Sequence, residues 1–308
     1  MENTINRAVF TKYGTSPRSL KGLGGGFYGR AFLVESDTPP YTVVAKLYLY
    51  PGIAEREARQ IKELSAHGTL KMPEIYGVLK SDENGLDYDV LFMEYINGVN
   101  ASEVSCAELS ENIKNDISDK IVENLIAYHS TVSKEGFGDL CSEKRFSSWQ
   151  EYYYPIAENI VKKAKELHSI GQINDYVLSV FERSIEAFHS IFRFPITEAR
   201  LIHGDYNMWN IMLNESRNKA YAVIDPFNCC YADSEYDLYQ LDNANGKDYG
   251  LLTKYCEKVK VSKNFIEKRR FYELYSEVNH YYDAHVEVYL PAVEKLAQLL
   301  DEVIKKHL

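Results

Sequence analysis

The N-terminal part of the chain alternates between short apolar, β-branched runs and clusters of turn residues. Residues 31–34 and 41–49 are two such runs, separated by the turn residues 36–40, and they predict a hairpin of paired strands. Two more strands are expected at 75–79 and 90–95. Between these pairs, the chain has a segment with helical spacing of its apolar residues, Ala54, Ala58, Ile61 and Leu64. The pattern therefore predicts a small sheet with one helix.

The hydrophobic period changes after Gly98. Apolar residues then recur every three or four positions on one helical face, at Ile113, Ile117, Ile121, Leu125 and Tyr128. Further helical stretches are expected at about 153–167, 175–191 and 265–306, and a hairpin-like segment at 201–224 interrupts them. The second half of the chain is thus predicted to be mainly helical.

This order of elements predicts an α+β fold with two lobes. A small N-terminal lobe of antiparallel sheet plus helix is expected at 1–96, and a larger, mainly helical C-terminal lobe at 97–308, with a hinge near 94–98. The cleft between such lobes is the natural place for a ligand. A length of 308 residues agrees with about two packed units.

Charge narrows the classes of partner. The chain carries 35 Lys and Arg against 45 Asp and Glu, so its formal net charge is -10. An electrostatic grip on nucleic acid or on an anionic membrane is therefore not expected, and a cationic or neutral ligand is favoured over an anion. No apolar run approaches the length of a membrane span, and the five cysteines have no Cys-x-x-Cys spacing. A cytoplasmic protein with reduced, packed cysteines is the expectation.

Glycines at 24, 26 and 29 satisfy the spacing G-x-G-x-x-G. A dinucleotide-binding loop with this spacing opens a helix, whereas here residues 30–34 continue as a strand. The context favours a glycine-rich flap between two strands, in which Gly24, Gly26 and Gly29 let backbone amides lie over phosphates. A plain turn is the alternative.

Lys46 follows Val-Val-Ala on the strand after this flap, which is the placement of a nucleotide-binding lysine. The following helix offers carboxylates as counter-ions, and Glu57 is the expected partner that holds Lys46 toward the α- and β-phosphates. Glu55 is the second choice. The alternative is that these are ordinary surface charges.

The segment from Leu201 to Leu213 contains H-x-D-x-x-x-x-N, made by His203, Asp205 and Asn210. Phosphoryl transfer needs such a pair, because a carboxylate can accept the proton of the acceptor hydroxyl and a carboxamide can supply a hard oxygen ligand to Mg2+. Asp205 is accordingly the expected base and Asn210 an expected metal ligand. His203 is expected to be structural.

Asp225 ends an apolar strand 15 positions after Asn210. An aspartate in this position is often only a turn former. A short hairpin would nevertheless bring it beside Asp205 and Asn210, where the metal-binding aspartate of a kinase lies. Asp225 is therefore the second expected ligand of Mg2+.

Together, His-Gly-Asp at 203–205 with Asn210, Ile-Asp at 224–225 and Glu-Tyr-Asp-Leu at 235–238 resemble the aminoglycoside phosphotransferase and fructosamine kinase-like family. The segment 91–98, Leu-Phe-Met-Glu-Tyr-Ile-Asn-Gly, resembles that family's lobe connector. The resemblance implies a bilobal, protein-kinase-like fold and ATP- or GTP-dependent phosphorylation of a hydroxyl on a small molecule. The acceptor it implies is similar to an aminoglycoside, a fructosamine, a sugar or an amino alcohol.

The same resemblance implies roles for three further residues. The backbone at Glu94 and Ile96 would bind the adenine edge, and Asp237 would brace the catalytic loop. A eukaryotic-type protein kinase is disfavoured, because no A-P-E element follows Asp225. A nucleotide-binding pseudokinase without turnover stays as the alternative function.

Tyrosine is unusually frequent, with 25 residues against 13 Phe, and aromatic residues crowd the segment 271–289. The plain interpretation is a helical core face with tyrosines at its rim. The functional interpretation is that these rings contact the acceptor, with Tyr281 stacking against it and Asp283 pairing with a cationic amine.

Overall fold

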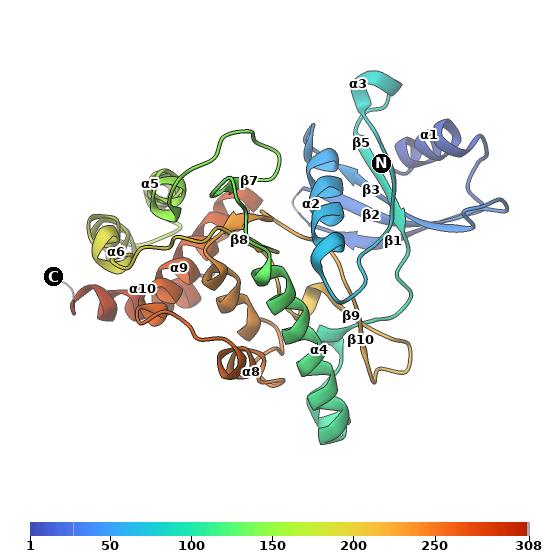
Figure 1. Cartoon of the computed structure of the whole chain (residues 1–308). Coiled ribbons are helices and arrows are strands. Elements are labelled where there is room, and N and C mark those ends of the chain that lie inside the picture. The colour runs from blue at the N-terminus through green and yellow to red at the C-terminus, as the bar shows by residue number, and fades with distance from the viewer. Residues whose placement is uncertain (27, 307–308) are drawn as a thin grey trace.

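A five-stranded antiparallel sheet forms the N-terminal part of the computed structural model, which describes residues 1–26 and 28–306 (Figure 1). Its strand order is β1-β2-β3-β5-β4. The strands are β1 (Ser19–Gly25), β2 (Gly29–Glu35), β3 (Thr42–Tyr48), β4 (Ile75–Leu79) and β5 (Asp89–Glu94). The four strands expected from the hydrophobic pattern are confirmed, and β1 joins them at the edge.

Two helices cover the two faces of this sheet. Because side chains alternate across a strand, Val90 and Phe92 of β5 pack with α1 (Glu2–Tyr13), while Leu91 and Met93 pack on the side of α2 (Ile53–His67). The same alternation in β3 buries its odd-numbered residues against α1 and turns Lys46 toward α2. Helix α2 agrees with the predicted helix, whereas α1 was not predicted.

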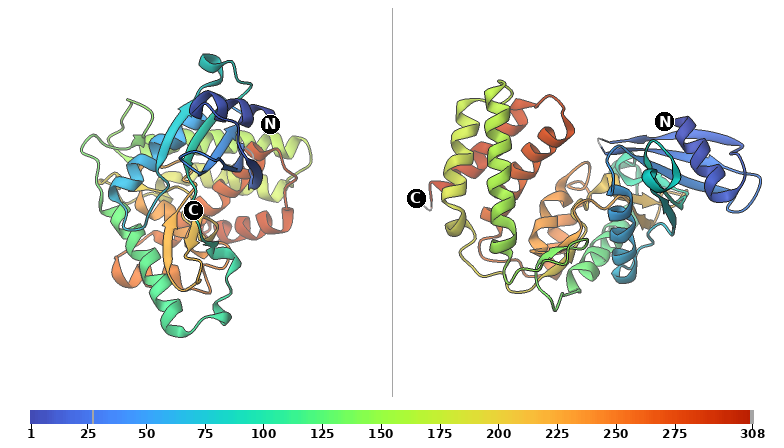
Figure 2. Two further views of the ribbon diagram at one scale, coloured as in Figure 1. Left: turned by 90° about the vertical axis from the view of Figure 1, so that its right-hand side faces the viewer. Right: turned by 90° about the horizontal axis from the view of Figure 1, so that it is seen from above.

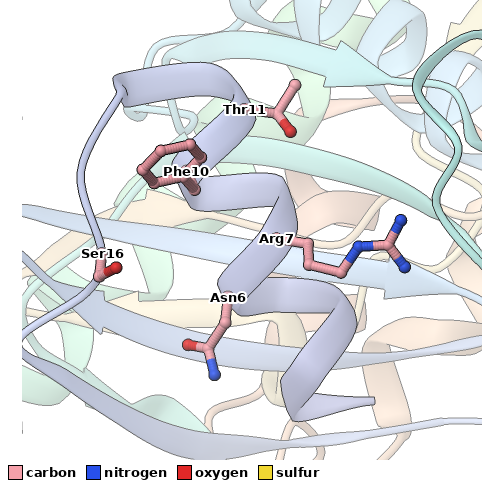
Figure 3. A pocket seen from close by; sticks show the side chains of 5 residues that line it. All are labelled: Asn6, Arg7, Phe10, Thr11 and Ser16. Carbon is pink, nitrogen blue, oxygen red and sulfur yellow. The ribbon is translucent and has the colours of Figure 1, made fainter.

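The outward side of α1 carries a shallow hollow lined by Asn6, Arg7, Phe10, Thr11 and Ser16 (Figure 3). It lies on α1 and the loop that follows, and α1 packs on the face of the sheet opposite α2. The hollow is therefore separated from Lys46 by the sheet itself.

Two small sheets follow in the C-terminal part. One has the order β10-β9-β6, with β6 (Val99–Asn100), β9 (Ile211–Leu213) and β10 (Ala220–Val223). The other has the order β7-β11-β8, with β7 (Gly138–Asp139), β8 (Arg200–Ile202) and β11 (Cys230–Ala232). The loops between these strands contain Asp205, Asn210 and Asp225, so the two small sheets position these three candidate site residues.

Helices make up most of the rest, and Figure 2 shows α5, α6, α9 and α10 at the opposite end of the molecule from the N-terminal sheet. The α-helices not yet bounded are α3 (Ser81–Asn84), α4 (Glu111–Ser130), α5 (Trp149–Ser169), α6 (Asp175–Glu186), α7 (Phe188–Ile191), α8 (Leu251–Lys258), α9 (Phe265–Ala284) and α10 (Leu290–Ile304). Four 3-10 helices complete the described elements: η1 (Ala101–Glu103), η2 (Cys106–Glu108), η3 (Met208–Asn210) and η4 (Ser234–Asp242). None of the described helices is both long and apolar enough to cross a membrane.

The predicted helical stretches are present, but two of them are broken. The stretch 265–306 divides into α9 and α10 because His285 adopts a left-handed conformation, with φ of 50°, and Pro291 lies in the first turn of the next helix. The stretch 175–191 divides at Ala187 into α6 and α7. The α+β class with an antiparallel N-terminal sheet and a larger helical part is confirmed.

Candidate active site

Lys46 and Glu57 form a buried ion pair between the sheet and α2. Lys46 Nζ lies 3.0 Å from Oε1 and 2.9 Å from Oε2 of Glu57, and the Tyr48 hydroxyl donates to Oε2 at 2.6 Å. Burial raises the pKa of Glu57, and Lys46 opposes this shift. Glu55, two positions earlier on α2, instead pairs with Lys80 at 3.0 Å. Of the two predicted partners, Glu57 is the one in contact with Lys46.

Asp225 also contacts the Lys46 ammonium group, through one carboxylate oxygen. Burial disfavours the charged lysine, but Glu57 and Asp225 outweigh it and raise its pKa. Asp225 has a φ of 56°, a left-handed conformation that an aspartate tolerates better than most residues. The Asp225 side chain is 53% exposed, so its carboxylate is open to a ligand while one oxygen touches Lys46.

Asp205 is held by two amides of its own loop. Asn210 Nδ2 donates to Asp205 Oδ2 at 2.7 Å, and Asn207 Nδ2 donates to Oδ1 at 2.6 Å. Burial, with the nearby charges of Asp225 and Asp237, raises the pKa of the Asp205 carboxyl to about 7 against these hydrogen bonds, which lower it. The Ile224 amide also donates to the Asn210 carbonyl oxygen at 2.9 Å. The loop of Asp205 is thereby joined to the strand that ends at Asp225.

Asp237 fixes the backbone at the start of this loop. Its two carboxylate oxygens each accept a backbone N–H at 2.8 Å, one from His203 and one from Gly204. His129 also contacts Asp237, at 3.3 Å. Gly204 has a φ of 81°, and a Cβ there would lie 1.9 Å from the carbonyl oxygen of Phe227, so only glycine fits.

His203 is fully buried beside Asp205. Its Nδ1 accepts the backbone N–H of Asp205 at 3.3 Å, which requires the neutral ring with Nδ1 unprotonated. Burial lowers the pKa of His203 to about 4, although Asp237 and Asp225 oppose this shift. The histidine is therefore neutral near pH 7 and orders the loop.

The glycine-rich segment forms the turn between β1 and β2, with Gly24 in β1, Gly26 in the turn and Gly29 at the start of β2. Phe27 lies outside the described residues. Near the tip, the Tyr28 ring packs on Phe227 with 5.2 Å between centroids. The flap thus reaches the segment that follows Asp225.

The predicted adenine-binding backbone lies where β5 ends. The Glu94 amide donates to the Glu74 carbonyl at 2.8 Å, so a purine edge would have to use the carbonyl of Glu94 and not its N–H. The Glu94 carboxylate contacts Lys71. Ile96 is buried, at 6% exposure, between this strand and β6.

The C-terminal aromatic segment divides into core and rim. Phe271, Tyr272 and Tyr275 are completely buried among the helices, as the plain interpretation expects. Tyr281 is partly buried against the same core. Asp283 binds Lys163 at 2.6 Å, so it is already paired with a cation of the chain.

Asp283 also acts electrostatically on Tyr28, next to the flap glycine Gly29. Its charge contributes to the raised pKa of Tyr28, second to burial and against Arg56, which lowers the pKa. The roles of Tyr281 and Asp283 remain predictions.

The model of the phosphotransferase enzyme family (APH) matches residues 19–250, which include the flap, Lys46, Asp205, Asn210 and Asp225. The chain belongs to the phosphotransferase enzyme family. The resemblance predicted from the sequence motifs is confirmed, and with it the expectation of a kinase-type transferase.

Relatives of this phosphotransferase have diverged far in sequence. It is 28% identical over 248 residues to the uncharacterized protein YcbJ of Escherichia coli K12, covering 80% of each chain. It is 22% identical over 292 residues to the chloroplastic protein-ribulosamine 3-kinase of Oryza sativa subsp. japonica, covering 91% of this chain and 78% of the relative.

Two solved structures show that the phosphotransferase has the kinase-like fold. A putative fructosamine-3-kinase from Haemophilus somnus 129PT superposes with a TM-score of 0.72 at 18% identity, covering 97% of this chain and 98% of the other. A thermostable mutant of aminoglycoside phosphotransferase APH(4)-Ia, in ternary complex with ADP and hygromycin B, gives a TM-score of 0.70 at 15% identity, covering 98% of each chain.

The donor atoms around Asp225 fit Mg2+. Asn210 directs its Nδ2 at Asp205, so its amide oxygen faces away from that carboxylate, and Asp225 is half-exposed. The amide oxygen of Asn210 and the carboxylate oxygens of Asp225 are hard ligands of the kind that Mg2+ prefers. Within residues 1–26 and 28–306, no group of three His, Cys, Asp or Glu side chains converges as a metal site. Phosphate oxygens or water would have to complete the coordination of an ion, as is usual for magnesium.

The sequence motifs missed two residues that organise this site. Tyr48 binds Glu57, and Asn207 holds Asp205 from the side opposite Asn210. Asn207 lies two positions after Asp205, so a polar side chain inside the motif was the available signal. Tyr48 shares its strand face with Lys46 two positions earlier, and that alternation could have identified it.

Proposed function

We propose that this phosphotransferase moves the γ-phosphoryl group of ATP or GTP to a hydroxyl of a small molecule. The observation that supports this most is one connected set of contacts. Glu57, Lys46 and Asp225 touch in series, and the Ile224 amide links that series to Asn210 and Asp205. A base, a cation and the expected metal ligands therefore converge in one place.

Each residue has a defined role in this proposal. Asp205 accepts the proton of the hydroxyl, whose oxygen bonds to the γ-phosphorus as the bond to the bridging oxygen of the nucleoside diphosphate breaks. Lys46, oriented by Glu57, binds the α- and β-phosphates, and the flap glycines Gly24, Gly26 and Gly29 lie over them. Asn210 and Asp225 would hold Mg2+, which supplies positive charge for the phosphates.

The nucleotide base would lie at the connector between the lobes. We place that connector at 94–98, where β5 ends and the chain passes to β6 in the other sheet. The carbonyl of Glu94 and the backbone of Ile96 would bind the purine edge. The complex of APH(4)-Ia with ADP supports a nucleotide donor in this fold.

The acceptor would lie between the catalytic loop and the end of α9. Its class follows the relatives, whose names include protein-ribulosamine, fructosamine and aminoglycoside kinases. We therefore propose a sugar-like or amino-alcohol acceptor that contacts Tyr281 and Asp283. An acceptor amine would share Asp283 with Lys163.

The decisive experiment is ADP release from Mg–ATP in the presence of candidate acceptors. Panels of glycated amines, aminoglycosides, simple sugars and choline-like alcohols are compared for the wild type and Asp205→Asn. We expect acceptor-dependent release by the wild type only, with nucleotide binding retained in the variant. Nucleotide binding without release by either protein would instead indicate a silent nucleotide-binding module.

A further inference from the structure

Helix α2 carries further polar side chains besides Glu57, the residue that binds Lys46. Arg56, Gln60 and Glu63 are spaced by four and three positions, so they share one side of the helix. Gln60 is 2% exposed, which is unusual for an amide side chain on a helix that packs against a sheet. We call these three residues the docking face, and Figure 1 shows α2 on the side of the sheet toward β7 and β8.

The two ends of the docking face bind the C-terminal part of the chain. Arg56 Nη2 lies 2.5 Å from Asp139 Oδ2 in β7. At the other end, the Tyr231 hydroxyl in β11 donates to Glu63 Oε1 at 2.9 Å. Helix α2 is therefore held to the sheet β7-β11-β8 at positions seven residues apart.

The middle of the docking face reaches the segment after Asp225. With its amide oriented to satisfy both groups, Gln60 donates to the carbonyl oxygen of Pro226 at 3.3 Å and accepts the N–H of Cys229 at 3.3 Å. Pro226 is the residue next to Asp225. One side chain of α2 thus fixes the backbone on which the proposed metal ligand depends.

The sheet β7-β11-β8, which contacts α2, also contains the strand that leads into the catalytic loop. Within it, Cys230 pairs with Asp139, and Tyr231 pairs with Leu201 in β8. Strand β8 ends at Ile202, and His203 and Asp205 follow directly. Tyr231 therefore pairs directly with the strand that leads into Asp205, and Asp139 is linked to that strand through β11.

We propose that the docking face positions the Lys46–Glu57 pair relative to Asp225 and Asp205, with Arg56, Gln60 and Glu63 as positioning residues. Glu57 is next to Arg56 on α2, so any shift of the helix moves the carboxylate that orients Lys46. Phosphoryl transfer depends on alignment, and a misplacement of about 1 Å can cost about a hundredfold in rate. This inference rests on the proposed function.

Stability alone does not explain the Arg56–Asp139 end of the docking face. Arg56 is 36% exposed and Asp139 is 21% exposed, and ion pairs at such sites contribute little to the free energy of unfolding. If the contacts matter for alignment, their loss should alter turnover and nucleotide binding far more than the unfolding midpoint. That difference separates a positioning role from a merely structural one.

The test uses the full chain with Arg56→Met and Tyr231→Phe combined, which removes both ends of the docking. We expect ADP release from saturating Mg–ATP to fall about tenfold or more and Mg–ADP to bind more weakly by calorimetry. In a Glu57→Gln background the same pair of substitutions should cause no further loss, because the docking acts through Glu57. Glu55→Gln on the same helix is the matched control, since it breaks the pair with Lys80, which lies just before α3.

The outcomes distinguish this inference from the proposed function. Unchanged turnover and Mg–ADP affinity in the double variant, or losses that add fully to those of Glu57→Gln, would overturn the positioning role. ADP release no greater for the wild type than for Asp205→Asn would refute the proposed transfer instead. The Mg–ADP arm still tests the docking face in that case, because it needs no turnover.

Discussion

Asn210 holds Asp205 at two points, donating from Nδ2 to its backbone oxygen at 2.8 Å and to its carboxylate Oδ2 at 2.7 Å. The two residues are five positions apart, and the turn of η3 closes the loop between them. The same amide nitrogen thus orients the proposed base and turns the Asn210 oxygen toward the proposed metal position. Asp205 and Asn210 therefore act as one unit.

The first prediction concerns this unit. Asn210→Ala removes a proposed metal ligand and both contacts to Asp205, so ADP release should fall by at least about a hundredfold. Steady-state rates at saturating Mg–ATP measure the effect. Asn218→Ala, in an exposed turn where Asn218 is hydrogen-bonded to the side chain of Asn214, is the control and should keep the wild-type rate. Equal rates for the two variants would contradict the assigned role of Asn210.

The second prediction concerns the brace under the catalytic loop. Asp237→Asn places an amide NH2 against one of the two backbone N–H groups that the carboxylate now accepts, from His203 and Gly204. Leaving a buried donor unsatisfied should lower the free energy of unfolding by about 1–3 kcal/mol. Urea unfolding measures the loss, and hydrogen exchange at these two amides should accelerate.

Asp242→Asn is the control for this brace. Asp242 ends the same 3-10 helix but pairs with Arg269 at a partly exposed position. Its loss should leave exchange at the His203 and Gly204 amides unchanged. If hydrogen exchange at both amides stayed as slow in Asp237→Asn as in the wild type, Asp237 would not be needed to hold the loop.

The third prediction is a pH dependence of stability. Burial lowers the pKa of His203 to about 4 from 6.5, so below about pH 6.5 the unfolded state binds a proton that the folded state does not. His203 should therefore destabilise the fold progressively as the pH falls from about 6.5 to 4, by up to about 3 kcal/mol. Above that range its contribution is constant.

The measurement compares urea unfolding of the wild type and His203→Gln at pH values from 7.5 down to 4.5. Glutamine does not titrate, so the variant should lose stability less steeply with falling pH, whatever its stability at pH 7.5. Parallel curves would show that His203 does not titrate with a lowered pKa.

The fourth prediction addresses the acceptor region. If Tyr281 and Asp283 contact the acceptor, replacing both by Ala should raise the KM of amine-bearing acceptors several-fold and leave the KM of the nucleotide unchanged. Asp283 also holds Lys163, so Lys163→Met is tested beside it. Asp175→Asn, at an almost fully exposed carboxylate, is the control. An unchanged acceptor KM in the double variant would exclude these two residues from the site.

The sequence predicted the parts of the site that are local in the chain. Asp205 and Asn210 lie in one loop, and Lys46 lies on a strand whose alternation decides which way it points. Glu57 was preferred to Glu55 from its local setting, and the structure places Glu57 against Lys46. Such placements can be inferred because spacing within a loop, strand or helix is nearly fixed by backbone geometry, whereas the roles of these residues stay predictions.

Sequence patterns could not predict the contacts between distant segments. Tyr28 on Phe227, Arg56 with Asp139 and Tyr231 with Glu63 each join parts of the chain that no short pattern relates. The predicted stretch 265–306 failed for a related reason. Apolar spacing continues through it, whereas the break at His285 is a backbone conformation that hydrophobic period does not encode.

By itself, the sequence determined the fold class, the family and the residue types of the candidate site, because hydrophobic period and motif spacing act over a few residues. Only the tertiary structure decided that Asp283 is already paired with Lys163, that Asp225 touches Lys46, and that α2 is fastened to the sheet beneath the catalytic loop. These depend on packing between segments far apart in the chain, where burial and long-range hydrogen bonds select one arrangement from many that the same local pattern allows.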